Sequence, residues 1–501
     1  MPTTFFNMTI RFLIVFLNKM AYNQYNRKRQ RKGIYMAANA TGLPTKDFFV
    51  GMLTRDIEIN DAILDLLDNC LDGVVRSKSG TNKLTDNSFY QGFYANILIN
   101  SNSFIIEDNC GGIPRDIAEK YAFRMGRDPS QPTDLPTVGI YGIGMKRAIF
   151  KMGQEAVVHT KSTAEKYSVV IPSGWAVSDD WDFPIVDKHT DNNLTNFGTK
   201  LIISALNSDI SELWRDSDRI DLFVDGLKQA VKESYSRIIE KGFKISINGS
   251  EVDYSPVELL FTQGESGPGI RPYLYSAEYD DVKVKVAIGF YAPPPTDDEI
   301  DEMNETRRSS ADAGITIVCN DRLVLYNDKS NLTGWGVNGV PHYHTQFIGI
   351  KGIVVFESNN PKKLPMTTTK RGVDHSSSIY ISAKDRICEG LKTFTNYTNK
   401  WKGQNTLERE YSNQATKTSY EQLFDTSKGI EMHTAREGKT YKPNLPIPPN
   451  DKPYRQIRYS RSVQDIKKLI EYFYKDSELD INPSEIGEKS FDKILEIAKG
   501  E

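Results

Sequence analysis

Four short segments between residues 65 and 199 constrain the fold of this chain more than any other feature. In chain order they are Asp65–Asn69, Asp108–Gly112, Gly139–Lys146 and Gly198–Thr199. Acidic helix faces and glycine clusters are each common, so none of the segments is specific alone. Their order and spacing together indicate one ligand pocket assembled from separate parts of the chain.

The first segment lies on a predicted amphipathic helix over residues 61–75, where apolar residues recur at helical spacing. Its other face carries Asp65, Asn69 and Asp72. Such oxygen-bearing side chains suit magnesium and water, because Mg²⁺ prefers hard oxygen ligands and usually keeps several waters and phosphate oxygens. A solvated acidic helix face is the alternative interpretation.

The second segment follows two predicted strands, 96–100 and 104–107, so Asp108 lies just beyond a strand end. Gly111 and Gly112, followed by Ile113, lack the side chains that would keep a planar ligand away from the backbone. Asp108 could accept a hydrogen bond from an exocyclic amine of such a ligand. An ordinary turn at a strand end is the alternative.

The third segment has the spacing GxxGxG and runs into a predicted helix start. It reads Gly139, Ile140, Tyr141, Gly142, Ile143, Gly144, Met145, Lys146. Backbone amides of a glycine loop, the helix N-terminus and the charge of Lys146 can hold phosphates together. The spacing differs from both a P-loop and a Rossmann turn. The irregular residues 124–138 before it could serve as a lid.

The remaining pattern predicts a mixed α+β chain of several parts. We expect a basic and apolar leader over 1–40, predicted to be disordered, then domains over 41–240 and 241–402, a linker over 403–456 and a small helical tail over 457–501. The second domain opens with the hairpin signal Asn248-Gly249. The apolar run 10–17 is too short to span a bilayer, and translation could instead begin at Met20 or Met36.

Composition limits the class of protein. The 501 residues are 39% hydrophobic and 26% charged, enough for two to four globular domains. A net charge of -3 gives no general attraction to nucleic acid. The four cysteines form no CxxC pair, so we expect small buried thiols in a reducing cytoplasm. We also expect no membrane association.

Taken together, the four segments make residues 45–205 similar to the ATP-binding domain of the GHKL superfamily, which includes gyrase, ninety-kilodalton heat-shock chaperones, histidine kinases and MutL. The resemblance implies the Bergerat α/β sandwich, with ATP and Mg²⁺ as ligands. It makes Asp65 the general base, Asn69 the magnesium ligand and Asp108 the partner of the adenine amine. The other expected ATP-binding residues are Asp72, Gly112, Ile113, Gly139, Tyr141, Gly142, Ile143, Gly144, Met145, Lys146 and Thr199.

Two positions depart from the pattern of that family. Asp65 stands where glutamate is usual, and its carboxylate is one methylene shorter, which puts the positioning of water in doubt. Cys110 stands where the first glycine of DxGxG is expected. Asp68 cannot replace the base, because it lies roughly 100° around the helix from Asn69.

The second domain resembles the transducer-like domain of Microrchidia (MORC) ATPases. The segments that carry this likeness are 314–325, 347–356, 364–370 and the helix from Ser382. The resemblance implies that Lys370 reaches the γ-phosphate and acts in catalysis. The alternative is a solvent-exposed lysine beside Arg371.

The expected function is an ATPase that closes and forms a homodimer on binding ATP, with DNA as a possible partner. A basic DNA-facing patch could comprise Lys351, Lys362, Lys363, Lys370 and Arg371, or these could be scattered surface charges. A nucleotide-binding scaffold without hydrolysis and a chaperone-like ATPase are the alternatives. A histidine kinase does not fit, because it would need a phosphoacceptor histidine on a dimerisation helix before the ATP domain. The first histidine of this chain is His159.

Overall fold

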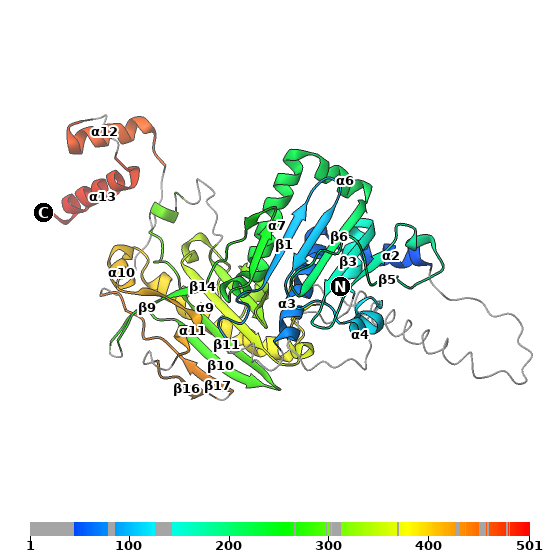
Figure 1. Ribbon diagram of the computed structural model, residues 1–501. Helices are drawn as coiled ribbons and strands as arrows, with labels where there is room; N and C mark the ends of the chain where they lie inside the picture. The colour runs from blue at the N-terminus through cyan, green and yellow to red at the C-terminus, as the bar shows by residue number, and fades with distance from the viewer. Residues whose placement is uncertain are drawn as a thin grey trace, which may run out of the picture.

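The computed structural model shows two sheet-based domains and a pair of C-terminal helices (Figure 1). It describes residues 45–78, 86–125, 143–264, 267–296, 298–300, 302, 312–367, 370–425, 430–435, 437–449, 457, 460–476, 479 and 481–500. The leader predicted over 1–40 lies outside these residues. The prediction of a mixed α+β chain is confirmed.

The first domain is built on an eight-stranded sheet in the order β5-β4-β3-β6-β2-β1-β7-β8. Its strands are β1 (Tyr94–Ile99), β2 (Phe104–Asp108), β3 (Gly153–Lys161), β4 (Lys166–Ile171), β5 (Ile185–Val186), β6 (Gly198–Leu206), β7 (Lys244–Ile247) and β8 (Ser250–Glu251). All neighbours are antiparallel except β1 and β7. The central position of β2 and β6 brings Asp108 and Gly198, at their ends, side by side.

Helices cover this sheet through one continuous apolar core. They are α2 (Lys46–Thr54), α3 (Ile59–Ser77), the short α4 (Arg115–Ile117), α5 (Gly144–Met152), α6 (Ser208–Arg215) and α7 (Ser217–Glu240). The π-helical turn Ala118–Ala122 follows α4 directly. In α3 every residue from Ala62 to Val75 is buried except Asn69. The helix is therefore nearly enclosed, and its polar side chains need partners inside the molecule.

The hairpin β7–β8 belongs to the first sheet, whereas the sequence pattern placed it at the start of the second domain. It turns at Asn248 and Gly249, both with positive φ, as the Asn-Gly signal predicts. Its strand β7 pairs in parallel with β1 across a long connection. Local turn chemistry identifies a hairpin but not the sheet that it joins.

The second domain contains a seven-stranded sheet in the order β13-β12-β14-β11-β10-β17-β16. Its strands are β10 (Tyr273–Tyr279), β11 (Val282–Phe290), β12 (Gly314–Cys319), β13 (Arg322–Asp328), β14 (Ile350–Glu357), β16 (His433–Ala435) and β17 (Gly438–Tyr441). Helix α9 (Ser378–Lys400) packs on one face. A second apolar cluster includes the β9–β15 pair (Glu258–Phe261 and Thr416–Ser419) and α11 (Tyr420–Leu423).

Much of the predicted linker is packed onto this second domain. Within 403–456 the chain forms α10 (Asn405–Ser412), β15, α11, β16 and β17, and β17 pairs with β10. Trp401 donates a hydrogen bond from Nε1 to the Pro446 carbonyl at 3.2 Å. Polar composition and prolines suggested a spacer, but buried anchors such as Tyr420 and Leu423 hold the segment in place.

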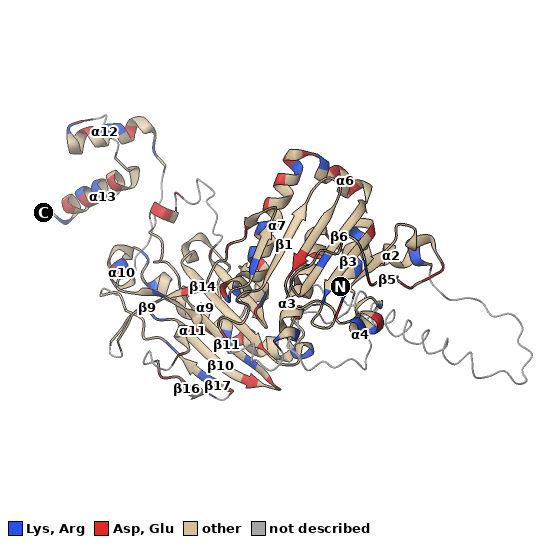
Figure 2. Ribbon diagram, in the orientation of Figure 1, with Lys and Arg blue, Asp and Glu red and all other residues tan. Residues whose placement is uncertain are grey.

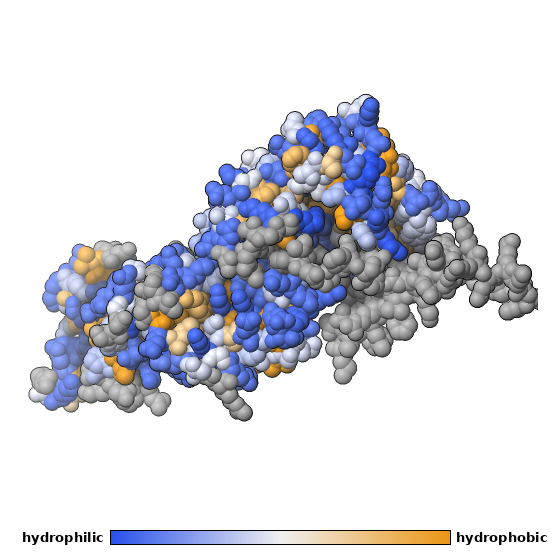
Figure 3. All heavy atoms as spheres, turned by 60° about the horizontal axis from the view of Figure 1, so that its bottom comes forward, coloured by the Kyte–Doolittle hydropathy of each residue, from blue (hydrophilic) through white to orange (hydrophobic). Residues whose placement is uncertain are grey.

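The tail consists of α12 (Val463–Tyr474) and α13 (Pro483–Lys499), which contact each other and lie apart from both sheets in Figure 1. None of the helices in the described residues has the length and apolarity needed to cross a membrane. On the side of the molecule seen in Figure 3, hydrophilic residues predominate and hydrophobic ones form small separate groups.

A buried ion-pair cluster joins the two domains at the turn between β12 and β13. Asp321 of this turn accepts hydrogen bonds from Arg237 Nε at 2.8 Å and from Lys241 Nζ at 2.9 Å, at the C-terminal end of α7. All three side chains are buried. Arg237 also pairs with Glu421 of α11, so two carboxylates of the second domain hold the end of α7 in place.

We expect Asp321→Asn to lower the free energy of unfolding by about 3 kcal/mol, because buried Lys241 loses this carboxylate and buried Arg237 keeps only its pair with Glu421. Asp280→Asn is the matched control: it also lies in a strand turn at positive φ and pairs with a lysine, but its side chain is exposed. Its effect should stay within about 0.5 kcal/mol. Denaturant melts of both variants test this, and equal effects would contradict the assigned role of Asp321.

Candidate functional site

Asp108 lies at the end of β2, where its carboxylate is held by the backbone. Its Oδ1 accepts hydrogen bonds from the amide of Cys110 at 2.8 Å and from the amide of Thr199 at 3.3 Å. Burial raises the pKa of Asp108 above its ordinary value, and these bonds work against that rise. The second and fourth sequence segments therefore meet in one site.

Glycines make this meeting possible. A Cβ at Gly198 would lie 1.9 Å from the Asp108 carbonyl oxygen, and a Cβ at Gly112 would lie 2.3 Å from the Lys161 carbonyl oxygen. Gly112 also has a φ of +70°, which favours glycine. Gly73 of α3 leaves room for the carbonyl of Cys110 in the same way. Close backbone contact, which a β-carbon would prevent, shapes the floor of the site.

The cysteines beside Asp108 are packing residues. Cys70 and Cys110 are buried, and burial raises the pKa of both thiols well above its ordinary value, with the charge of Asp108 adding to the rise. Both therefore stay protonated at neutral pH. Cys110, in place of the expected glycine, fills space between Asp108 and the Tyr94 carbonyl.

The first and third segments meet on the other side of α3. Asp65 forms an ion pair with Arg147, which lies on the first turn of α5. A Cβ at Gly144, where α5 begins, would lie 3.2 Å from the Asp65 side chain. The N-terminus of α5 therefore faces the acidic face of α3.

The expected ligands on α3 differ in exposure. Asn69 is exposed on the otherwise enclosed helix, and Asp72, one turn beyond Asp68, is buried. Thr199, Ile113, Ile143 and Met145 are partly buried around the site. The predicted residues Gly139, Tyr141 and Gly142 lie outside the described residues. Within the part that is described, no cluster of three or more histidine, cysteine, aspartate or glutamate side chains could hold a metal ion.

Lys146 lies almost fully buried on α5. Its Nζ donates a hydrogen bond to the Ala122 carbonyl at 2.9 Å. Burial lowers the pKa of Lys146 to about 7. At neutral pH, Lys146 is therefore divided between its charged and its neutral form, and a nearby anion would favour the charged form.

Lys370 extends from the second domain into the first. Its side chain is buried, with Nζ 2.6 Å from Asp68 Oδ2 and 3.5 Å from Asp65 Oδ1. Its φ of +58° lies in a region that residues other than glycine rarely adopt and that often marks functional positions. The alternative of a solvent-exposed surface lysine is therefore wrong.

Sequence reasoning missed Asp68, which is almost completely buried. Besides Lys370, it is bound by Arg322 Nε at 3.2 Å and by the Tyr235 hydroxyl at 2.8 Å. Burial alone would raise the pKa of Asp68, but the charges of Lys370 and Arg322 outweigh burial and lower the pKa. An aspartate on the enclosed side of an apolar helix was the available signal, because such a charge requires a buried partner.

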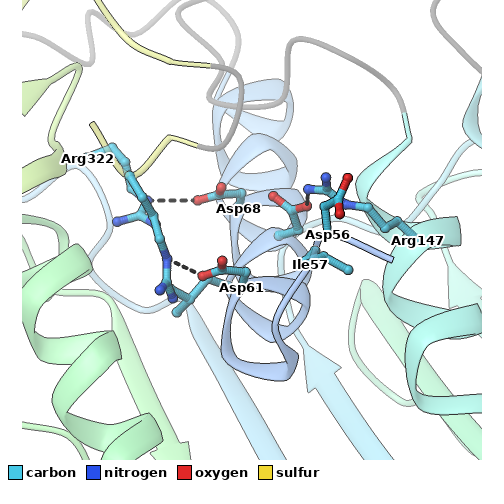
Figure 4. A pocket seen from close by; sticks show the side chains of 9 residues that line it. Asp56, Ile57, Asp61, Asp68, Arg147 and Arg322 are labelled. Carbon is cyan, nitrogen blue, oxygen red and sulfur yellow. Dashed lines mark hydrogen bonds and ion pairs between the residues drawn. The ribbon is translucent and has the colours of Figure 1, made fainter. Parts of the chain in front are cut away.

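These charges surround a small cavity between the domains (Figure 4). Arg322 points to Asp68 from one side, and Arg147 approaches from the opposite side. The other charged residues of the lining are Asp56, Asp61, Asp65 and Arg371, with Arg371 paired to Asp61. The cavity thus combines cations from both domains with carboxylates from one helix and the residues before it.

The five basic residues proposed as a DNA-facing patch do not form one. Lys370 is buried between the domains, and Lys351 is buried in β14. Lys363 is paired with Asp280 and Asp281, and Arg371 with Asp61. Only Lys362 of the five is exposed without an ion pair among the described residues. In Figure 2, α12 and α13 each carry both basic and acidic residues.

Comparison with known proteins supports the nucleotide interpretation of this site. Residues 57–199 match the family described as Histidine kinase-, DNA gyrase B-, and HSP90-like ATPase. The match begins just before α3, ends at Thr199 and includes all four segments. The match supports a GHKL-type ATPase domain over these residues, for which ATP binding is expected. Among curated proteins no match was found.

We expect Gly198→Ala to destabilise the first domain by about 3 kcal/mol, because the new Cβ would overlap the Asp108 carbonyl and separate β6 from β2. Gly226→Ala on α7 is the control, since nothing lies within 4 Å of its Cβ position. That variant should be neutral or slightly more stable. Thermal melts compare the two, and an unaffected Gly198→Ala protein would contradict the close contact.

Proposed function

We propose that this chain is a Mg²⁺-dependent ATPase that uses ATP to close its two domains and to form a homodimer. The observation that carries the proposal is the Asp108 carboxylate, buried and oriented by two backbone amides at the end of β2. Such a carboxylate can accept a hydrogen bond from the adenine amine. The family match of residues 57–199 supports this assignment.

The opposite end of the site suits the phosphates. Lys146 and the N-terminus of α5 supply positive charge, and Asn69 is the exposed oxygen ligand on α3. A bound Mg²⁺ would neutralise charge on the phosphate oxygens. Asp65, one helical turn before Asn69, is in the position of the base that orients the attacking water.

Closure of the domains follows from the interdomain contacts. Lys370 already lies among the carboxylates of α3, so a γ-phosphate would give this lysine a further partner at the domain interface. A ligand shifts such an equilibrium only by its different affinity for the two states, and the γ-phosphate supplies that difference between ATP and ADP. The likeness of the second domain to MORC transducer domains supports this role and suggests work on DNA.

A second candidate function is a nucleotide-binding scaffold without hydrolysis. It is favoured by the ion pairs of Asp65, whose carboxylate contacts Arg147 and lies 3.5 Å from Lys370. A carboxylate that is already paired with two cations is less available to orient the attacking water. Its shorter side chain adds to the same effect. The two candidates share the binding site and differ only in turnover.

We expect Asp108→Asn to lose ATP binding, because the amides of Cys110 and Thr199 would keep the one acceptor oxygen of the new side chain and leave its NH2 donor facing the adenine amine. Asp65→Ala should retain binding and lose phosphate release by about 100-fold or more. Calorimetry for affinity and a phosphate-release assay, with and without DNA, measure both. Asp225→Asn, an exposed aspartate on α7, serves as the control.

The outcomes separate the candidates. Wild-type binding with no phosphate release under any condition would favour the scaffold. Failure of the folded wild-type protein to bind any adenine nucleotide would contradict both candidates. Unchanged ATP binding by Asp108→Asn would mean that Asp108 does not contact the adenine.

We expect ATP binding to take up a proton at pH 8. In the free protein Lys146 has a pKa of about 7 and is mostly neutral at pH 8, whereas nearby phosphates favour its charged form. Affinity should therefore fall as pH rises from 7 to 9 and should not depend on this group below about pH 6. Calorimetry in two buffers of different ionisation enthalpy measures the proton, and Lys146→Met should abolish it.

A further inference from the structure

Asp68 has more partners than one carboxylate needs. Lys370, Arg322 and Tyr235 all bind it, and the first two are charged. Arg322 is fixed independently of Asp68, because its Nη1 donates to the Ser234 and Leu323 carbonyls, both at 3.0 Å, and its guanidinium lies 4.3 Å from the Tyr235 ring centre. Arg322 and Tyr235 therefore stay beside the Asp68 carboxylate whether or not Lys370 binds it.

Lys370 is the partner that can leave. Its backbone amide donates to the Thr367 carbonyl at 3.0 Å, and Met366 bridges to Val373, so the two ends of the loop are joined to each other. Its contact with α3 is made by the end of a long side chain, which can change direction without moving the loop. If Lys370 left, Asp68 would keep one cation and one hydroxyl, and no buried charge would be left without a partner.

We propose that Asp68 is a positioning residue that holds Lys370 between the domains in the absence of nucleotide, and that the terminal phosphate of ATP competes with Asp68 for this lysine. The proposal rests on the proposed function and adds the resting partner of Lys370. Asp65 lies 3.5 Å from the same ammonium group, so the transfer also removes one of the two cations beside Asp65. ADP, which lacks that phosphate, leaves Lys370 on Asp68.

The proposal gives opposite effects for two changes at one carboxylate. Asp68→Asn weakens the resting contact of Lys370, so the preference for a non-hydrolysable ATP analogue over ADP should rise by about tenfold. Tyr235→Phe removes one of the two remaining partners of Asp68 while keeping the ring under Arg322, so release of Lys370 becomes costlier. The same preference should then fall by about threefold. A purely structural role would shift both variants in one direction.

The experiment measures dissociation constants for the ATP analogue and for ADP by calorimetry on the full chain. Asp61→Asn is the matched control, because it breaks a different ion pair between α3 and the second domain, the one with Arg371, and Asp61 makes no ion pair with Lys370. Its ratio of the two constants should equal that of the wild type. In a Lys370→Gln background, Asp68→Asn should no longer change the ratio.

Tyr235→Phe keeps the test valid if Asp68→Asn fails to fold, since it removes only a hydroxyl. Ratios that move in the same direction in both variants, or that stay unchanged, would overturn the proposal. Wild-type protein that binds both nucleotides equally would overturn it too, while leaving nucleotide binding intact. Wild-type protein that binds neither would overturn the proposed function itself.

Discussion

The structure depends on the cations that neutralise the buried aspartates of α3. This helix passes through the middle of the molecule, and its carboxylates are compensated by cations from α5 and from the second domain. Asp68, for example, requires Arg322 and Lys370, which lie more than 250 residues further along the chain. Because buried charges are costly when unpaired, these pairs hold the domains in one arrangement.

The two interdomain clusters have different properties. At Asp321, Arg237 and Lys241 at the end of α7 share one carboxylate, Arg237 also pairs with Glu421, and the proposed cycle gives neither cation a new partner. At Asp68, one carboxylate has three partners, and one of them, Lys370, comes from a loop facing the proposed phosphate site. In the proposed cycle the first cluster would stay fixed as a hinge, and at the second Lys370 would change partners. Domain closure about the end of α7 would then follow the position of one lysine.

Local sequence patterns predicted the pieces of the site well. The helix over 61–75, the strand before Asp108 and the helix start at Gly144 all occur, because each depends on periodicity or on turn chemistry within a few residues. Long-range pairing could not be predicted in the same way. The hairpin at Asn248 joins the first sheet, much of 403–456 packs on the second, and Asp68 finds its cations in another domain. Each of these outcomes depends on partners that no local pattern specifies.

The central claim is that one site binds ATP between Asp108 and Lys370 and that the γ-phosphate takes Lys370 from Asp68. A crystal structure of the full chain with Mg²⁺ and a non-hydrolysable ATP analogue tests it most directly. The account predicts an adenine amine hydrogen-bonded to Asp108 and the Lys370 ammonium group within 3.5 Å of a γ-phosphate oxygen, roughly the limit of a hydrogen bond. An analogue bound elsewhere, or bound here with Lys370 still on Asp68, would contradict it.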